Sequence, residues 1–271
     1  MGGGAVPDEL VVPATAAGLR LQVRGRRLDV VLDRPDRRNA QTPATWRALA
    51  AVGHWARGAA DVVVLRATGP SFSAGLDRGA LTPGGIEGER GLHELAALPP
   101  AELDATIAGF QEGFAVWGQG PFVSVAAVQG HAVGAGFQLA LACDVRIAAD
   151  DARFAMREPA LGLVPDLGGT APLVEAVGFA RAVDICATAR WVDADEALRI
   201  GLVQHVVAPG ALDAAVDAFA AAVLAHPAAA VRATRALLAG AAARDRPEQL
   251  AAERSAQGDR LRALLREGPE G

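Results

Sequence analysis

Short aliphatic runs alternate with longer amphipathic segments along most of the chain. Runs bounded by glycine, proline or charged residues are typical of buried strands. The predicted strands cover residues 19–24, 28–32, 61–65, 122–128, 145–148 and 203–207, with a further short one around Phe154. Because Gly25 and neighbouring basic residues separate the first two runs, we expect those two strands to form a hairpin.

The segments between these strands have helical patterns. The predicted helices cover residues 42–56, 101–117, 136–143, 168–178, 180–188 and 193–200. The first begins at Thr42-Pro43, because threonine is a good N-cap and proline fits the first turn. Strands that alternate with helices up to about residue 207 favour an α/β fold.

Two glycine-rich segments interrupt this alternation. We expect 69–77 to be a loop and 78–100 to be a mobile loop or a region of short helices. From Ala211 onward the chain is rich in alanine, leucine and arginine, with helix breaks at Pro227, Gly240 and Pro247. This part has too little large apolar content for a core of its own, so it should pack on the main body or on a neighbouring subunit. The predicted organisation is an N-terminal extension, 1–18, an α/β core, 19–207, and a C-terminal helical region, 208–271.

One uncharged segment, Phe122–Cys143, is long enough to span a bilayer. Its three glycines and several polar side chains instead favour a strand, a turn and a buried helix. The first fifteen residues carry Asp8 and Glu9 and no basic stretch, so they are not expected to be a secretory signal. We therefore expect a cytoplasmic protein that does not bind membranes.

The composition of the 271 residues excludes several chemistries. The chain has no lysine and no tyrosine, and all 26 basic residues are arginines, which excludes Schiff-base lysines, P-loop lysines and phenolic acids. Its two cysteines, Cys143 and Cys186, cannot form a thiolate zinc cluster or a disulfide framework. We expect no metal. A net charge of −5 also argues against nucleic acid as a partner. Acid–base chemistry is left to carboxylates and five histidines.

Three segments could carry chemistry. In Val125–Leu139 a buried strand leads through a glycine-rich turn into an apolar helix, which presents backbone N–H groups to a phosphate or an oxyanion. The alternative is that these glycines serve only close packing. A dinucleotide fingerprint is not supported, because Leu139 stands where its third glycine is needed. His131, beside the turn, fits a packing or hydrogen-bonding role better than a catalytic one.

The second segment, Gly69–Asp77, contains Gly75, where the backbone can approach a ligand closely. Its serines lie in no Gly-x-Ser-x-Gly elbow, so it does not indicate a hydrolase, and by itself it is an ordinary loop. The third segment, Phe154–Gly169, sets Glu158 and Asp166 among apolar residues, where carboxyl groups tend to have raised pKa values. The alternative for these two carboxylates is an exposed turn.

Five motifs occur in order along the chain. They are Arg34-Pro35 with Arg38-Asn39-Ala40, then Ser71–Asp77, then Gly130–Gly136 with Leu139–Asp144, then Glu158 with Gly162, Pro165 and Gly168-Gly169, and finally Ala187–Leu198 with Gly201-Leu-Val. Together they resemble the crotonase family, the enoyl-CoA hydratase/isomerase superfamily, over about residues 19 to 240. The resemblance implies a spiral of ββα units, with the region 208–271 used for trimer contacts or as a lid. It also implies a homotrimer or a dimer of trimers.

The resemblance further implies an acyl-CoA ligand and no cofactor other than the coenzyme A of the substrate. The oxyanion hole would consist of the backbone N–H groups of Leu76 and Ala135. The residues that the resemblance places at coenzyme A are Arg37, Arg38, Ala40, Ala74 and Asp77, with Arg78 as a further phosphate candidate. Arginine suits this role because its guanidinium fork matches phosphate oxygens. The alternative is that each of these arginines is only a solvated surface residue.

The sequence departs from the family pattern at one catalytic position. The resemblance implies that a hydratase of this family has two glutamates 20 residues apart. The second corresponds to Glu158 here, but the position of the first is occupied by Gln138. A neutral amide can position water but cannot exchange a proton at neutral pH. Asp166 corresponds to an acid of the dienoyl-CoA isomerase branch. A dehalogenase branch has a nucleophilic aspartate there, but that branch lacks a glutamate at position 158.

These observations support three hypotheses. The favoured one is an isomerase that shifts a double bond in an enoyl- or dienoyl-CoA, with Glu158 as the proton shuttle. Asp166 would then be a second relay or an electrostatic partner, unless it is only a turn residue. The second hypothesis is a hydratase-like lyase in which Gln138 positions water. The third is an acyl-CoA-binding paralogue with little turnover.

Overall fold

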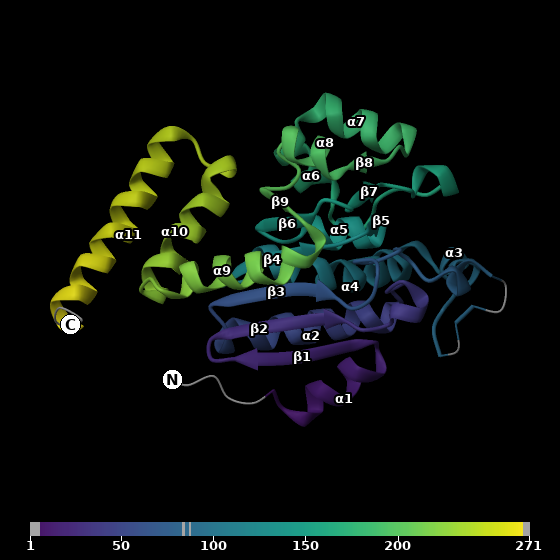
Figure 1. Cartoon of the computed structure of the whole chain (residues 1–271), viewed down its shortest axis with the longest axis horizontal. Helices are drawn as coiled ribbons and strands as arrows, with labels where there is room; N and C mark the ends of the chain where they lie inside the picture. Colours follow the sequence, from purple (N-terminus) through teal and green to yellow (C-terminus); the bar gives the residue numbers. More distant parts are fainter. Residues whose placement is uncertain (1–5, 83–84, 87, 268–271) are drawn as a thin grey trace.

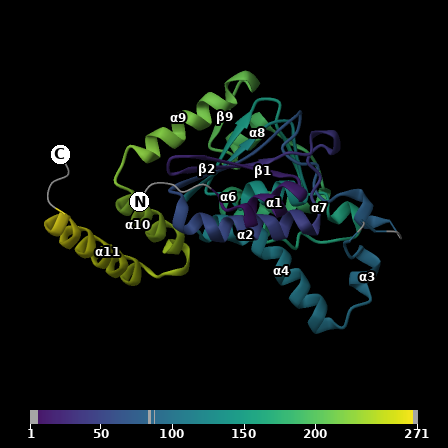
Figure 2. The same cartoon turned by 90° about the horizontal axis from the view of Figure 1, so that it is seen from below.

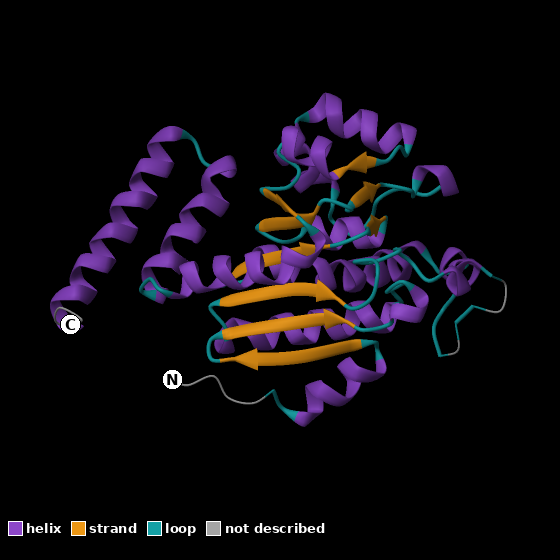
Figure 3. Ribbon diagram, in the orientation of Figure 1, coloured by secondary structure: helices purple, strands orange, loops and turns teal. Residues whose placement is uncertain are grey.

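Two β-sheets form the centre of the protein, shown here by a computed structural model that describes residues 6–82, 85, 86 and 88–267 (Figures 1 and 3). The larger sheet has the strand order β1-β2-β3-β4-β6-β9 and is parallel except for β1. Its strands are β1 (Leu19–Arg24), β2 (Arg27–Leu32), β3 (Val62–Ala67), β4 (Val123–Val128), β6 (Val145–Ala149) and β9 (His205–Val207). The smaller sheet, β5-β7-β8, contains β5 (His131–Val133), β7 (Arg153–Ala155) and β8 (Val192–Asp193).

Helices cover both faces of the larger sheet, as the two views in Figures 1 and 2 show. The helices on one face are α2 (Pro43–Ala59) and α4 (Pro100–Gln119), and α9 (Leu212–Leu224) lies on the other. Successive residues of a strand point to opposite faces. Thus Val62 and Val64 pack in a cluster with Val216 of α9, whereas Val63 and Leu65 belong to the main core. A sheet covered on both faces explains why the first four residues of β3 are all apolar and buried.

The remaining helices surround this frame. They are α1 (Asp8–Ala16), α3 (Leu92–Ala96), α5 (Ala135–Leu141), α6 (Thr170–Val177), α7 (Phe179–Thr188), α8 (Ala194–Arg199), α10 (Ala228–Gly240) and α11 (Arg246–Glu267). Short 3-10 turns are η1 (Pro35–Arg37), η2 (Arg78–Leu81), η3 (Pro159–Leu161), η4 (Pro209–Ala211) and η5 (Ala241–Ala243).

The α/β class, the first hairpin and the cap of α2 agree with the sequence predictions. Thr42 and Thr45 form a capping box at the start of α2, with Pro43 in the first turn. The region 78–100 forms η2 and α3, and the prediction for residues 83, 84 and 87 lies outside the described residues. The same holds for residues 1–5 of the N-terminal extension and 268–271 of the C-terminal region.

Three local predictions were wrong or incomplete. The extension contains α1 although Pro13 lies inside it, because packing against α2 and β1 buries Ala14 to 1% exposure. The glycine-rich turn after β4 contains β5, which is stabilised by parallel pairing with β7, far along the chain. The helix expected from Gly168 begins at Thr170, since Gly168 has φ of 85° and lies outside helical geometry.

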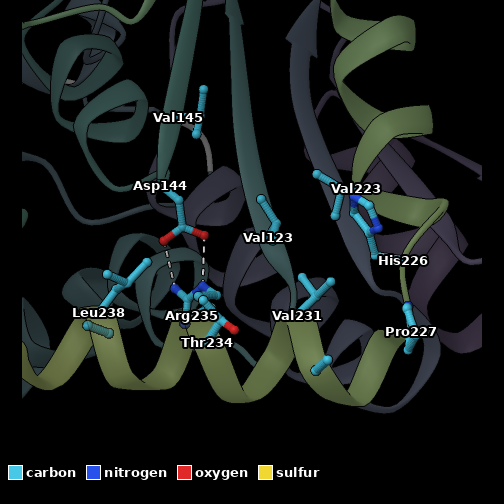
Figure 4. Close-up of a pocket in the computed structure, with 12 residues that line it drawn as sticks. Val123, Asp144, Val145, Val223, His226, Pro227, Val231, Thr234, Arg235 and Leu238 are labelled. Atoms are coloured by element: carbon cyan, nitrogen blue, oxygen red, sulfur yellow. Dashed lines mark hydrogen bonds and ion pairs between the residues drawn. The ribbon is translucent and has the colours of Figure 1, made fainter. Parts of the chain in front are cut away.

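The C-terminal helices α10 and α11 stand side by side at one end of the body (Figures 1 and 2). Two arginines of α10 fasten it to residues that directly precede strands. Arg232 pairs with Asp61 before β3, and Arg235 donates two 2.8 Å hydrogen bonds to Asp144 before β6 (Figure 4). The helix therefore lies at the amino ends of the parallel strands.

A cavity of about 830 Å³ lies between α10 and the strands β4 and β6 (Figure 4). Its lining is mainly apolar and includes Val123, Val145, Val231 and Leu238. Among the described residues, no single helix is both long and apolar enough to cross a membrane; the bent pair Pro209–Leu224 with Ala228–Ala243 reaches those limits only when taken together.

Candidate active site

The candidate site lies at the carboxyl ends of the parallel strands, opposite α10. The loop after β3 carries Gly75 and Leu76, and the chain after β4 carries Gly134 and Ala135. Gly75 has φ of 86°, and a Cβ there would stand 2.5 Å from the carbonyl oxygen of Val133. Glycine at this position therefore lets the two segments touch, which brings Leu76 next to the start of α5.

The N–H groups of Leu76 and Ala135 have no hydrogen-bond acceptor within the described part of the chain. Ala135 is the first residue of α5, where N–H groups lack partners inside the helix and the helix dipole is positive. A Cβ on Gly136 would meet the carbonyl oxygen of Ser73 at 2.6 Å, so the loop and the helix are in direct contact. This arrangement brings together the two donors predicted for an oxyanion.

The loop at 34–41 is held by Asn39, which stabilises two residues in the left-handed region. Arg38 has φ of 49° and Asn39 has φ of 54°. The Asn39 amide donates 2.8 Å hydrogen bonds to the carbonyl oxygens of Thr68 and Ser71, and its oxygen accepts one from the N–H of Arg34. These bonds tie the loop to the segment that carries Gly75.

Ser73 and Gln41 complete this connection. The Ser73 hydroxyl donates to the carbonyl oxygen of Asn39 at 2.7 Å and accepts from the Gln41 amide and from the N–H of Gly75. The Gln41 oxygen accepts a hydrogen bond from the Trp46 indole at 2.8 Å. Because these side chains are buried, the backbone around Leu76 is rigidly placed.

The residues expected at coenzyme A lie along this same edge. Arg37, Arg38 and Arg78 are exposed and form no salt bridge with another described residue. The N–H of Ala74 donates to the carbonyl oxygen of Arg38 at 2.9 Å, which joins the two loops. The three arginines are thus available to an anionic ligand beside the loops.

Sequence reasoning missed the role of Arg34. Its guanidinium donates to the carbonyl oxygen of Ala40 at 2.7 Å and to the Asp77 carboxylate at 3.2 Å. Asp77 also accepts from the N–H of Gly79, so its carboxylate is engaged within the protein. The Arg34-Pro35 motif was a signal of the family, but it did not indicate which carboxylate the arginine would meet.

Glu158 directly precedes η3 and lies against Gly134. A Cβ on Gly134 would stand 3.1 Å from Glu158 Oε1, and Gly134 has φ of 51°. The carboxyl group is therefore adjacent to the start of α5 and to the N–H of Ala135. Glu158 Oε1 accepts a hydrogen bond from Gln138 at 2.8 Å. Glu158 Oε2 is buried and has no partner in the described ranges.

Burial is the main reason why the pKa of Glu158 is raised above its ordinary value. The nearby Asp166 charge raises this pKa further, whereas the hydrogen bond from Gln138 opposes the shift. Burial also raises the pKa of Asp166. The structure thus brings Gln138 and Glu158 into contact, with Asp166 close enough for its charge to act on Glu158. The half-buried Cys186 thiol on α7 is close enough to sense the charge of Glu158: its pKa is raised by burial first and then by that carboxylate.

His131 lies in β5, three residues before Gly134, and takes part in packing. Its Nδ1 lies 3.3 Å from the Ser71 hydroxyl, and its ring meets the edge of Trp191 at 5.5 Å between centroids. Asp144 has structural contacts, with Ser124 and Arg235. Across the residues that the structure describes, no group of three or more His, Cys, Asp or Glu side chains could hold a metal ion.

Comparisons with known proteins agree on one family. The family model described as Enoyl-CoA hydratase/isomerase matches residues 28–270. A Rhodobacter capsulatus protein named "Probable enoyl-CoA hydratase" is 35% identical over 230 residues, which is 85% of this chain and 84% of that protein. The "Short-chain-enoyl-CoA hydratase" of Clostridium acetobutylicum is 49% identical over 88 residues, covering 32% of this chain and 34% of its own.

Solved structures show the same likeness. The crystal structure of a "putative enoyl-CoA hydratase" from Thermobifida fusca in complex with acetoacetyl-CoA has a TM-score of 0.90 and 50% sequence identity. The match covers 94% of this chain and 98% of that one. A complex of a Thermobifida fusca protein of the same description with CoA has a TM-score of 0.89 and 48% identity, covering 94% and 97% of the two chains.

Proposed function

The chain belongs to the enoyl-CoA hydratase/isomerase family, and we propose that it shifts a double bond in an enoyl- or dienoyl-CoA. The observation that carries the proposal is that Glu158 Oε2, buried beside the start of α5, has no hydrogen-bond partner among the residues that the structure describes. A partnerless carboxyl oxygen in an apolar site is suited to removing a proton from carbon and returning it. Its raised pKa brings its basicity closer to neutral pH.

In this reaction the thioester oxygen would sit at the N–H groups of Leu76 and Ala135. Two preorganised donors stabilise the negative charge that develops on this oxygen as a proton leaves the neighbouring carbon. Glu158 takes that proton, the C–H electron pair enters the conjugated dienolate, and the proton returns at the other end. The double bond moves, and the product has the same atoms as the substrate.

Asp166 is proposed as the partner of Glu158 in this shuttle. Both carboxyl groups have raised pKa values because they are buried, and the charge of Asp166 further disfavours ionisation of Glu158. Such a pair titrates together rather than as two independent acids. In such a pair one group can hold a proton while the other accepts one.

A hydratase-like lyase is the second candidate, and it is favoured by the names of the relatives. In that reaction Gln138 would position a water molecule. Its oxygen already accepts hydrogen bonds from the N–H groups of Leu167 and Gly169, and its amide already donates to Glu158. Gln138 therefore has one N–H left for water and no group that can exchange a proton. This argues for the isomerase.

A panel of thioesters tests the proposal. The protein is incubated with 2-enoyl-, 3-enoyl- and dienoyl-CoA, and the products are followed by mass. We expect rearranged products of unchanged mass, lost in Glu158→Gln. Products heavier than the substrate by the mass of one water would show that the protein is the hydratase-like lyase. Binding of the thioester without any product would show that it is a non-catalytic paralogue.

We also propose that copies of the chain associate through the C-terminal hairpin α10–α11, as a trimer or dimer of trimers. The hairpin exposes several large apolar side chains to solvent, a costly arrangement for an isolated chain. They are Leu238, Leu250, Leu261, Leu264 and Leu265. Sedimentation equilibrium should give the mass of three or six chains, and Leu265→Glu should reduce it. A wild-type mass of one chain would contradict this proposal.

A further inference from the structure

Gln138 stands where family hydratases have a glutamate, and its surroundings fix which way its amide points. The side chain is 1% exposed. Its oxygen accepts hydrogen bonds from the N–H of Leu167 at 2.9 Å and from the N–H of Gly169 at 3.2 Å. A flipped amide would turn its NH₂ group toward these two donors and its oxygen toward Glu158, so it would lose all three bonds. The NH₂ group therefore faces the carboxyl group.

Gly169 holds the Gln138 side chain in place. A Cβ on Gly169 would lie 2.7 Å from Gln138 Cγ, so the backbone packs directly on the side chain. On the other side, the Gln138 amide donates at 2.8 Å to Glu158 Oε1, whose carboxyl group rests against Gly134. The amide, the carboxyl group and the start of α5 thus form one continuous, close-packed unit.

We propose that Gln138 is a positioning residue that makes the two oxygens of Glu158 unequal, fixing Oε1 as an anchor and leaving Oε2 as the only atom that exchanges protons. The inference deepens the proposed function, on which its kinetic part rests. A donor can bond to a carboxylate more strongly than to a neutral carboxyl group, so the hydrogen bond from Gln138 also opposes the rise that burial causes in the pKa of Glu158.

A carboxylate at position 138 would have the opposite effect. It could keep the two acceptor bonds to Leu167 and Gly169, but it would face Glu158 Oε1 without a proton to donate. The two carboxyl groups would then repel each other unless one of them took up a proton, so they would titrate as a coupled pair. Gln138 thus converts a two-acid site into one with a single oriented base.

The charged and titratable groups that face Glu158 belong to three segments. Asp166 follows η3, Cys186 lies on α7, and Arg157 precedes Glu158, with its guanidinium donating to the carbonyl oxygen of Ala189. None of these contacts Gln138 through a hydrogen bond among the described residues. Changes at position 138 should therefore move the titration of Glu158 without altering those neighbours.

Infrared titration of the full-length protein tests this directly, because the C=O stretch of a protonated carboxyl group reports Glu158 without any turnover. The band that disappears in Glu158→Gln is assigned to Glu158. In Gln138→Met the midpoint of this band should rise by about one to two pH units, since a hydrogen bond to the charged form is lost. In Gln138→Glu it should split into two steps, the upper one above the wild-type midpoint.

The variant Gln138→Glu retains a side-chain oxygen that can accept from the backbone N–H groups of Leu167 and Gly169, so it keeps the test valid if Gln138→Met does not fold. In both variants kcat for isomerisation should fall at least about tenfold, while KM for the thioester stays within about twofold. An unchanged midpoint in both variants would overturn the inference. A shifted midpoint in a protein that isomerises no thioester would uphold it and refute the proposed function instead.

Discussion

The two ends of the parallel sheet hold buried carboxylates in opposite ways. At the amino ends, Asp61 is 7% exposed and is bonded by both Arg26 and Arg232. The hydrogen bond from Arg26 is the main reason why the pKa of Asp61 is lowered, with Arg232 adding to it. At the carboxyl ends, the side chain that donates to Glu158 among the described residues is a neutral amide, one oxygen of Glu158 has no partner there, and its pKa is raised.

The difference separates a structural carboxylate from a reactive one. A carboxylate with two guanidinium partners is held ionised, so it fastens α10 to the body and has little tendency to accept a proton. Burying a carboxylate without a cation costs free energy. Such carboxylates are found at sites where the group takes part in a reaction. The following changes test the contrast, beginning with the largest effect.

Glu158→Gln should abolish activity without unfolding the protein. The amide keeps the shape of the side chain but removes the base, so kcat should fall about 10²- to 10⁴-fold. A raised folded-state pKa costs stability as pH rises above the unfolded pKa of about 4.3, so the variant should be at least as stable as wild type at neutral pH. Steady-state kinetics and denaturant unfolding measure both effects; full activity in Glu158→Gln would remove Glu158 from the mechanism.

Asp61→Asn should reduce stability and leave activity intact, the reverse of Glu158→Gln. Loss of the charge leaves two guanidinium groups poorly paired, which should lower the free energy of unfolding by about 1 to 3 kcal/mol, with kcat nearly unchanged. Asp259→Asn, at an exposed pair on α11, is the control and should change stability by less than about 0.5 kcal/mol.

The effect of Asp61→Asn should also depend on pH. Because the folded-state pKa of Asp61 is lowered, its contribution is present above the unfolded pKa of about 3.9 and is lost as pH falls through the folded value. The unfolding free energies of wild type and variant should therefore converge below about pH 4. A constant difference down to the acid transition would contradict this assignment.

Gly169→Ala should have the smallest effect. It disturbs Gln138, whose amide holds Glu158 Oε1. The new methyl group would displace Gln138, which should reduce kcat about tenfold and stability by about 1 kcal/mol. Gly109→Ala on α4 meets no atom within 4 Å and should leave kcat unchanged, with stability equal or slightly higher. Equal kcat values for the two variants would show that the Gln138 amide needs no fixed position.

The candidate residues of the site could be predicted from the sequence more readily than the hydrogen bonds that hold them in place. Glu158 and Asp166 could be singled out because carboxylates in an apolar stretch are unusual, and the order of the motifs pointed to Leu76 and Ala135. The partners of the Gln138 oxygen lie 29 and 31 residues further along the chain. Such contacts depend on tertiary packing, which periodicity and spacing do not describe.

The same reason explains the differences in the fold. Pro13 and several β-branched residues disfavour a helix locally, but packing of Ala14 against the body stabilises α1. The pairing of β5 with β7, and of Arg34 with Asp77, likewise joins residues distant in sequence. Local patterns predict an element well only where its own side chains determine it.

Deuterium transfer during turnover tests the central claim most directly, namely that Glu158 Oε2 carries a proton between two carbons of one substrate. A 3-enoyl-CoA is converted in D₂O, and the product is analysed by mass and NMR. We predict a 2-enoyl-CoA that has gained no water and carries deuterium at the new C–H position only in part, because the shuttled proton is partly retained in the buried site. A product one water heavier, formed at the same rate in Glu158→Gln as in wild type, would contradict the account.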